Sequence, residues 1–216
     1  AGRGGWKFFE AWMADAAAAQ RQLESDLRRA LPDGELQLAY QPIVDSKDHR
    51  VLAREALLRW SHPDRGDVPP SVFVPVIEDV GLMVPVGNWV LREACREAAA
   101  WSDGARVAVN ISAAQLAGGG LATTVLSALA GSGLPADRLE LELTESIFLA
   151  DDGRTREELA RLRSIGVRLV LDDFGTGYSS YGCLVGGHFS KLKIDRGFVG
   201  AAAGGCREAS AIVESV

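Results

Sequence analysis

The chain has 216 residues, a formal net charge of −6 and 47% hydrophobic residues, which suits one globular domain of α/β barrel size. It has no basic run that would form the cationic face needed to bind a DNA or RNA polymer, and no apolar run of about 18 residues that would span a membrane. Its three cysteines are widely spaced, as expected of reduced thiols. We therefore expect a cytoplasmic domain, whose parent protein could carry a membrane anchor outside this sequence.

The N-terminal region is predicted to form a helix over residues 6–31, where apolar side chains recur at helical spacing. Pro32-Asp33-Gly34 ends this helix. Its second half is highly charged, as in a solvated connecting helix. We interpret residues 1–31 as the tail of a preceding module with its linker, and residues 32–216 as the main domain.

The main domain begins with two predicted strands, at residues 35–44 and 51–60. The connection between them is too short for a crossover, so they should form an antiparallel hairpin. Residues 61–70 are rich in Pro, Asp and Gly and are predicted to be a loop. Helices are expected over residues 71–80 and 86–101.

Strands and helices then alternate along the rest of the chain. The predicted strands are 106–110, 139–143, 167–171 and 191–194, and the predicted helices are 121–130, 155–165, 181–184 and 207–216. This alternation implies a parallel sheet, and continuous apolar strands favour a closed barrel. Because six strands are found where such a barrel has eight, the predicted fold is α/β, a TIM-like (β/α) barrel with an antiparallel first strand that lacks its last two strands.

Two adjacent carboxylates, Asp172 and Asp173, end an apolar run and precede the turn Gly175-Thr176-Gly177. A single Asp in this position often caps a helix. A buried pair of carboxylates repel each other and lose hydration, and a divalent cation would offset both costs. The pair therefore favours a metal site.

The ends of the other predicted strands carry further polar groups. They are Glu55, Arg59, Asn110, Glu142, Glu145, Lys193 and Asp195. Catalytic groups of such barrels lie at the C-terminal ends of the strands, whereas solvated polar residues would be scattered over both ends. The oxygen ligands suit one or two Mg or Mn ions, which together can hold a phosphodiester and generate hydroxide. Arg59 suits a phosphate oxygen, and Lys193 could orient or deprotonate water.

Six motifs in this order resemble those of EAL-domain cyclic-di-GMP phosphodiesterases. They are Tyr40-Gln41-Pro42-Ile43, Glu55-Ala56-Leu57-Leu58-Arg59, Val109-Asn110-Ile111-Ser112, Glu142-Leu143-Thr144-Glu145, Asp172-Asp173-Phe174-Gly175-Thr176-Gly177-Tyr178-Ser179-Ser180 and Lys193-Ile194-Asp195. The resemblance implies metal-dependent hydrolysis of cyclic-di-GMP to linear pGpG in bacterial second-messenger signalling.

By matching position, the resemblance also implies residue roles. Glu55, Asn110, Glu142 and Asp172 would ligate one Mg or Mn ion, and Asp173 a second. The catalytic set would be Lys193, which assists the attacking water, with Glu55 and Asp173. Arg59 and Gln41 would bind substrate. Glu145 would brace the loop at residues 174–180, which the family links to dimerisation, so a homodimer through the EAL domain is expected.

Residues 6–31 resemble the end of a GGDEF cyclase domain, so a covalently linked GGDEF domain is expected in the parent protein. The family has a further catalytic glutamate, in an E-G-V-E motif, and a later glutamine that this sequence does not reach. The chain as given is therefore expected to be impaired. Two alternatives stay open: an inactive EAL domain that senses cyclic-di-GMP without cleaving it, and a protein-interaction module.

Overall fold

The computed structural model describes residues 11–145, 147, 153–174, 189–207 and 210, with side chains from residue 18 onward. The chain forms two compact units. The first comprises Ala1–Gln37 and Leu58–Leu82, and the second comprises Leu38–Leu57 and Met83–Val216. The predicted helix at 181–184, most of the one at 207–216 and the start of the one at 6–31 lie outside the described residues.

The first unit is built from two helices and a short hairpin. Its elements are α1 (Ala11–Ala30), the end of β2 (Val51–His62), β3 (Gly66–Val68) and α2 (Pro70–Asp79). Helix α1 packs on α2, and the large side chains of Leu27, Trp60 and Phe73 are almost fully buried. Burial of these side chains stabilises the unit by roughly 1.5–3 kcal/mol each.

The loop predicted over residues 61–70 is wrong in part. Strand β2 continues to His62 and pairs antiparallel with β3. The turn between them is closed by the His62 ring, whose Nδ1 accepts hydrogen bonds from the backbone N–H groups of Asp64 and Arg65. Composition alone did not reveal a hairpin this short.

The second unit contains most of a sheet ordered β1-β2-β4-β5-β6-β7. The strands not yet given are β1 (Leu36–Val44), β4 (Arg106–Ile111), β5 (Leu139–Thr144), β6 (Arg168–Phe174) and β7 (Lys191–Ile194). Each neighbouring pair from β2 through β7 is parallel. The carboxyl ends of β4, β5, β6 and β7 therefore meet at one edge of the sheet, as the sequence predicts.

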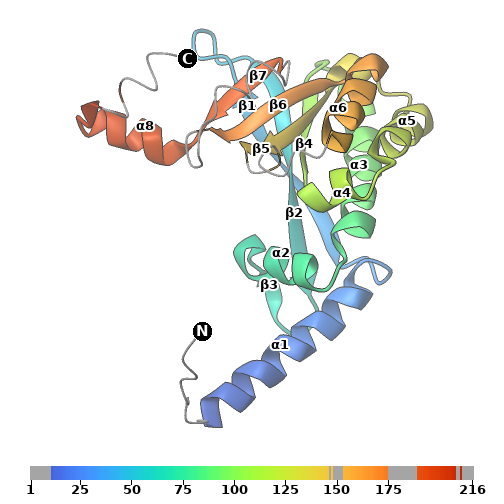
Figure 1. Ribbon diagram of the computed structural model, residues 1–216, viewed down its shortest axis with the longest axis vertical. Coiled ribbons are helices and arrows are strands. Elements are labelled where there is room, and N and C mark those ends of the chain that lie inside the picture. The colour runs from blue at the N-terminus through green and yellow to red at the C-terminus, as the bar shows by residue number, and fades with distance from the viewer. Residues whose placement is uncertain (1–10, 146, 148–152, 175–188, 208–209, 211–216) are drawn as a thin grey trace. The chain divides into compact units, whose positions relative to one another are not determined.

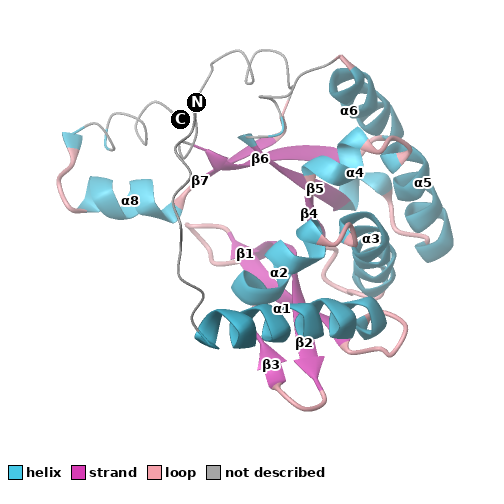
Figure 2. Cartoon of the chain, turned by 60° about the horizontal axis from the view of Figure 1, so that its bottom comes forward, coloured by secondary structure: helices cyan, strands magenta, loops and turns pink. Residues whose placement is uncertain are grey.

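Helices cover one face of this parallel sheet (Figures 1 and 2). They are α3 (Met83–Ala99), α5 (Leu121–Ser132) and α6 (Arg154–Ile165), with the short α4 (Ala113–Ala117) and the 3-10 turn η1 (Ala136–Arg138) between strands. Helix α3 packs on β4 and α5, and α5 packs on α6. Apolar and acidic side chains alternate along β5. Leu139, Leu141 and Leu143 are fully buried, while Glu140 and Glu142 point to the opposite face of the sheet.

Helix α8 (Arg196–Ala203) follows β7 and was not predicted. Its N-cap is Asp195, whose side chain accepts a hydrogen bond from the Gly197 N–H. Glycine and alanine dominate this helix, so its apolar period was not visible in the sequence. No helix in the described part of the chain has the length and apolarity needed to cross a membrane.

Candidate active site

Five consecutive strands of the sheet, β2, β4, β5, β6 and β7, bring together polar residues that the sequence singled out. Glu55 lies on β2, Glu142 on β5, Asp172 on β6 and Lys193 on β7. The register places Asn110 of β4 opposite Glu142. All five belong to the second unit.

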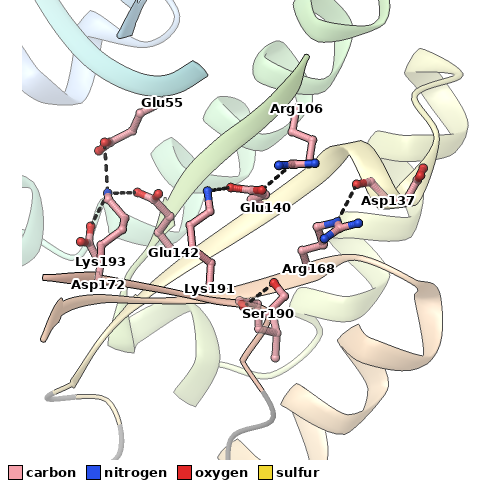
Figure 3. A network of polar contacts seen from close by, with 11 residues as sticks. Glu55, Arg106, Asp137, Glu140, Glu142, Arg168, Asp172, Ser190, Lys191 and Lys193 are labelled. Atoms are coloured by element: carbon pink, nitrogen blue, oxygen red, sulfur yellow. Dashed lines mark hydrogen bonds and ion pairs between the residues drawn. The ribbon is translucent and has the colours of Figure 1, made fainter. Parts of the chain in front are cut away.

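Lys193 is the meeting point of three carboxylates. Its Nζ lies 3.1 Å from Glu55 Oε2, 2.7 Å from Glu142 Oε2 and 2.8 Å from Asp172 Oδ2 (Figure 3). Burial alone would lower the pKa of Lys193, but its hydrogen bonds to Asp172 and Glu142 raise that pKa above its ordinary value. Lys193 is therefore an ammonium at neutral pH and neutralises part of the acidic cluster.

Glu142 is the most buried member of the cluster, with 1% of its surface exposed. Burial raises the pKa of Glu142 to about 7, against the opposing effect of Lys193, and the charges of Glu55 and Asp172 add to the rise. Its Oε1 is buried and accepts no hydrogen bond from the described residues. A buried acceptor without a donor is costly, and a cation ligated there would remove that cost.

The residues present fit a hard divalent cation. Glu55, Glu142 and Asp172 can each offer one oxygen, and these three atoms lie within 4.8 Å of one another. Such an all-oxygen set suits Mg or Mn. Asn110 donates from Nδ2 to Glu55 Oε1 at 2.9 Å, so it orients this carboxylate; its own predicted role as a ligand stays a prediction.

Asp173 has an unusual backbone conformation, with a φ of 54°. The pairing register between β6 and β7 shifts at this point, between Leu171 and Phe174, and the Asp173 N–H donates to Asp172 Oδ1 at 2.9 Å. Burial, followed by the charges of Asp172 and Asp195, raises the pKa of Asp173. Left-handed non-glycine residues cost free energy and are found at functional sites, which supports a functional role for this carboxylate. Asp173 is not in the three-carboxylate group, so its ligation of a second ion stays a prediction.

The remaining predicted residues lie in different settings. Arg59 belongs to the first unit, where it is exposed and donates to the Leu58 carbonyl oxygen. Gln41 is exposed on β1. Glu145 is buried, and neither carboxylate oxygen has a hydrogen-bond partner among the described residues. The loop that Glu145 was predicted to brace lies, beyond Phe174, outside them. Their functional roles stay predictions.

Sequence reasoning missed three charged residues next to this cluster. Glu140 accepts hydrogen bonds from Arg106 and Lys191 (Figure 3). Only polar groups near strand ends were considered, and these three lie further back. A usable signal was present, because Glu140 and Lys191 each precede a site residue by two positions and so share its face of the sheet.

The fold and the cluster define a class: a parallel α/β barrel-type protein with an acidic, metal-type site at the carboxyl ends of its strands. The EAL domain model matches residues 24–216. The chain therefore belongs to the EAL domain family.

Known proteins similar to this chain agree with that assignment. An uncharacterised signalling protein of Caulobacter vibrioides is 47% identical over 198 residues, covering 92% of this chain and 24% of the relative. The bifunctional diguanylate cyclase/cyclic di-GMP phosphodiesterase MucR of Pseudomonas aeruginosa is 45% identical over 202 residues, covering 92% of this chain and 30% of the relative. The chain thus spans about a quarter to a third of the length of these relatives.

A solved structure of PaMucR phosphodiesterase in complex with c-di-GMP is similar to this chain with a TM-score of 0.84 and 43% identity. The match covers 90% of this chain and 80% of that one. It confirms the predicted fold class, an incomplete TIM-like barrel.

Proposed function

We propose that this chain is the phosphodiesterase domain of a larger signalling protein and that it hydrolyses cyclic-di-GMP to linear pGpG with Mg or Mn. One observation carries the proposal: Glu55, Glu142 and Asp172 converge on Lys193 at the carboxyl ends of parallel strands. Similarity to MucR, a named cyclic di-GMP phosphodiesterase, supports the substrate.

The chain's own residues have distinct tasks in this reaction. Glu55, Glu142 and Asp172 would hold the cation, Asp173 would be available for a second one, and Asn110 keeps Glu55 oriented. When bound, Mg or Mn supplies polarisation of the phosphodiester and acidification of a water. Lys193, as an ammonium, would orient the attacking water and offset negative charge on the phosphoryl oxygens. Water adds to phosphorus, one P–O ester bond breaks, and the leaving oxygen takes up a proton.

The proposal is tested on the full-length protein that contains this chain. Cyclic-di-GMP is incubated with Mn, with Mg or with EDTA, and the products are separated by chromatography. We expect linear pGpG with either metal and none with EDTA. Asp173→Asn, which keeps a side chain that tolerates a positive φ, should lose turnover, whereas Asp137→Asn at an exposed position of η1 should not.

The inactive-sensor alternative predicts a different result. If the full-length protein binds cyclic-di-GMP but yields no pGpG with any metal, the enzymatic proposal is overturned. We further propose a homodimer through the EAL domain and a covalently linked GGDEF domain. Sedimentation of the full-length protein at several concentrations would show a monomer if the first of these is wrong.

A further inference from the structure

A second layer of charged residues lies behind the candidate site, nearer the N-terminal ends of the strands. This lower layer consists of Arg106 on β4, Glu140 on β5 and Lys191 on β7. Each precedes a candidate-site residue of its own strand by two or four positions, so it shares that residue's face of the sheet. Figure 3 shows both layers side by side.

Glu140 is the centre of the lower layer. It is 1% exposed, and both its oxygens are engaged. Oε1 accepts from Arg106 Nε at 2.6 Å, and Oε2 accepts from Lys191 Nζ. The three-carboxylate group does not include Glu140, so the cost of burying its charge is not explained by metal ligation.

Each layer contains an ion pair between β7 and β5, and we call each of these ion pairs a rung. Lys191 contacts Glu140, and Lys193 contacts Glu142, so both rungs join β7 to β5 across the intervening strand β6. Strand β7 has only four residues, and its pairing with β6 is interrupted by a register shift. A slip of one residue would turn both lysines to the other face of the sheet. The Glu140 rung opposes that slip.

We propose that Glu140, through Lys191, is a positioning residue that holds β7 in the register from which Lys193 reaches Glu55, Glu142 and Asp172. The inference deepens the proposed function and rests on it. It assigns to Glu140 no contact with substrate or metal.

The test compares Glu140→Gln, Lys191→Met and the double variant in the full-length protein. Two quantities are measured: turnover of cyclic-di-GMP with Mn, and the affinity for Mn²⁺ alone from the EPR signal of free Mn²⁺. Loss of an outer partner of a metal site commonly lowers activity by about 10-fold or more. We expect each single variant to lose about 10-fold in kcat, with KM changed less than about threefold, and to bind Mn²⁺ more tightly than the wild type, because the Lys193 ammonium no longer occupies the three carboxylates. The double variant should lose no more than Glu140→Gln, because both changes remove the same rung.

Two controls separate positioning from general stability. Glu158 is also a buried glutamate, 5% exposed, and accepts a hydrogen bond from the Ala122 N–H on the helical layer. Glu158→Gln should lower stability and leave Mn²⁺ affinity unchanged. Lys191→Arg keeps the charge of the rung and should retain kcat close to that of the wild type.

The inference is overturned if Glu140→Gln and Lys191→Met keep wild-type kcat and Mn²⁺ affinity, or if their losses multiply in the double variant. Should Glu140→Gln fail to fold, the contrast between Lys191→Met and Lys191→Arg decides, since Lys191 is partly exposed. If the wild type shows no turnover, the proposed function fails, and the Mn²⁺ affinities alone still decide the role of Glu140.

Discussion

The Lys193 ammonium forms ion pairs with three carboxylates from three different strands, so three negative charges share one positive charge. In the absence of metal, its ammonium is the cation that reduces the repulsion among Glu55, Glu142 and Asp172. The same residue is proposed to assist hydrolysis. Removing the charge of Lys193 should therefore lower turnover but strengthen metal binding.

Lys193→Met should lower turnover by about 100-fold or more, the usual contribution of a group that stabilises charge in the transition state. It should also bind Mn²⁺ more tightly than the wild type, because the carboxylates lose their internal cation. Turnover and Mn²⁺ EPR titrations measure both effects, with Lys47→Met at an exposed turn as the control. Weaker Mn²⁺ binding by Lys193→Met would show that Lys193 supports the ligands rather than competing with the metal.

Glu142 predicts a pH dependence of stability in the metal-free protein. Its pKa rises from 4.5 to about 7 on folding, so the native state holds a proton that the unfolded state has released between these pH values. The free energy of unfolding should therefore fall as pH rises from about 4.5 to about 7, by up to about 3 kcal/mol at about 1.4 kcal/mol per pKa unit. Urea unfolding in EDTA at pH 5 and pH 7.5 measures this fall. Glu142→Gln should reduce it, and an unchanged pH dependence would contradict this prediction.

At the scale of elements, the strand that carries Lys193, β7, leads directly into α8. Strand β7 ends at Ile194, and the next residue, Asp195, caps α8. The cap accepts a hydrogen bond from the Gly197 N–H at 2.8 Å, which satisfies one of the donors that a helix N-terminus leaves open.

Asp195→Ala should lower the free energy of unfolding by about 1 kcal/mol, the usual cost of losing an N-cap. Asp195→Asn should lower it by only a few tenths of a kcal/mol, because Asn caps helices nearly as well. Urea unfolding of the two variants measures the difference. Equal losses would mean that the charge of Asp195, and not its capping hydrogen bond, contributes the stability.

The elements also show what the sequence could and could not reveal. The positions of Glu55, Glu142, Asp172 and Lys193 followed from strand ends and from the period of two along a strand. The lower layer around Glu140 was missed because only polar groups near strand ends were considered, although the same period of two places Glu140 and Lys191 on the face of the site. The shift at Asp173 was also missed, since β6 continues through both aspartates to Phe174 instead of ending before them.

At the scale of the whole molecule, β2 belongs to both units. Glu55 lies in the part that forms the second unit, and Trp60 and His62 lie in the part that forms the first. Asp26 of α1 contacts this strand, because its buried carboxylate lies 3.2 Å from His62 Nε2. The same carboxylate accepts hydrogen bonds from Gln22 and Arg29 of α1. Burial alone would raise the pKa of Asp26, but these hydrogen bonds lower it.

Asp26→Ala should destabilise the first unit by about 2 kcal/mol, because it removes hydrogen bonds to a charged group. Hydrogen exchange should increase in residues 18–37 and 58–82, while Mn²⁺ affinity should stay within about twofold, since the carboxylate cluster lies in the second unit. Asp33→Ala, at an exposed position, is the control. A large loss of Mn²⁺ affinity in Asp26→Ala would show that the two units are energetically coupled.

The left-handed backbone of Asp173 has a consequence for how this family can diverge. A change to Asn or Gly there removes a carboxylate and keeps a residue suited to positive φ, whereas a change to Val or Ile opposes the backbone itself. If Asp173 acts in catalysis as proposed, a change to Asn or Gly would remove activity without straining the backbone. Descendants of such an enzyme that retain only the ability to bind its ligand should carry Asn or Gly at position 173 more often than a β-branched residue.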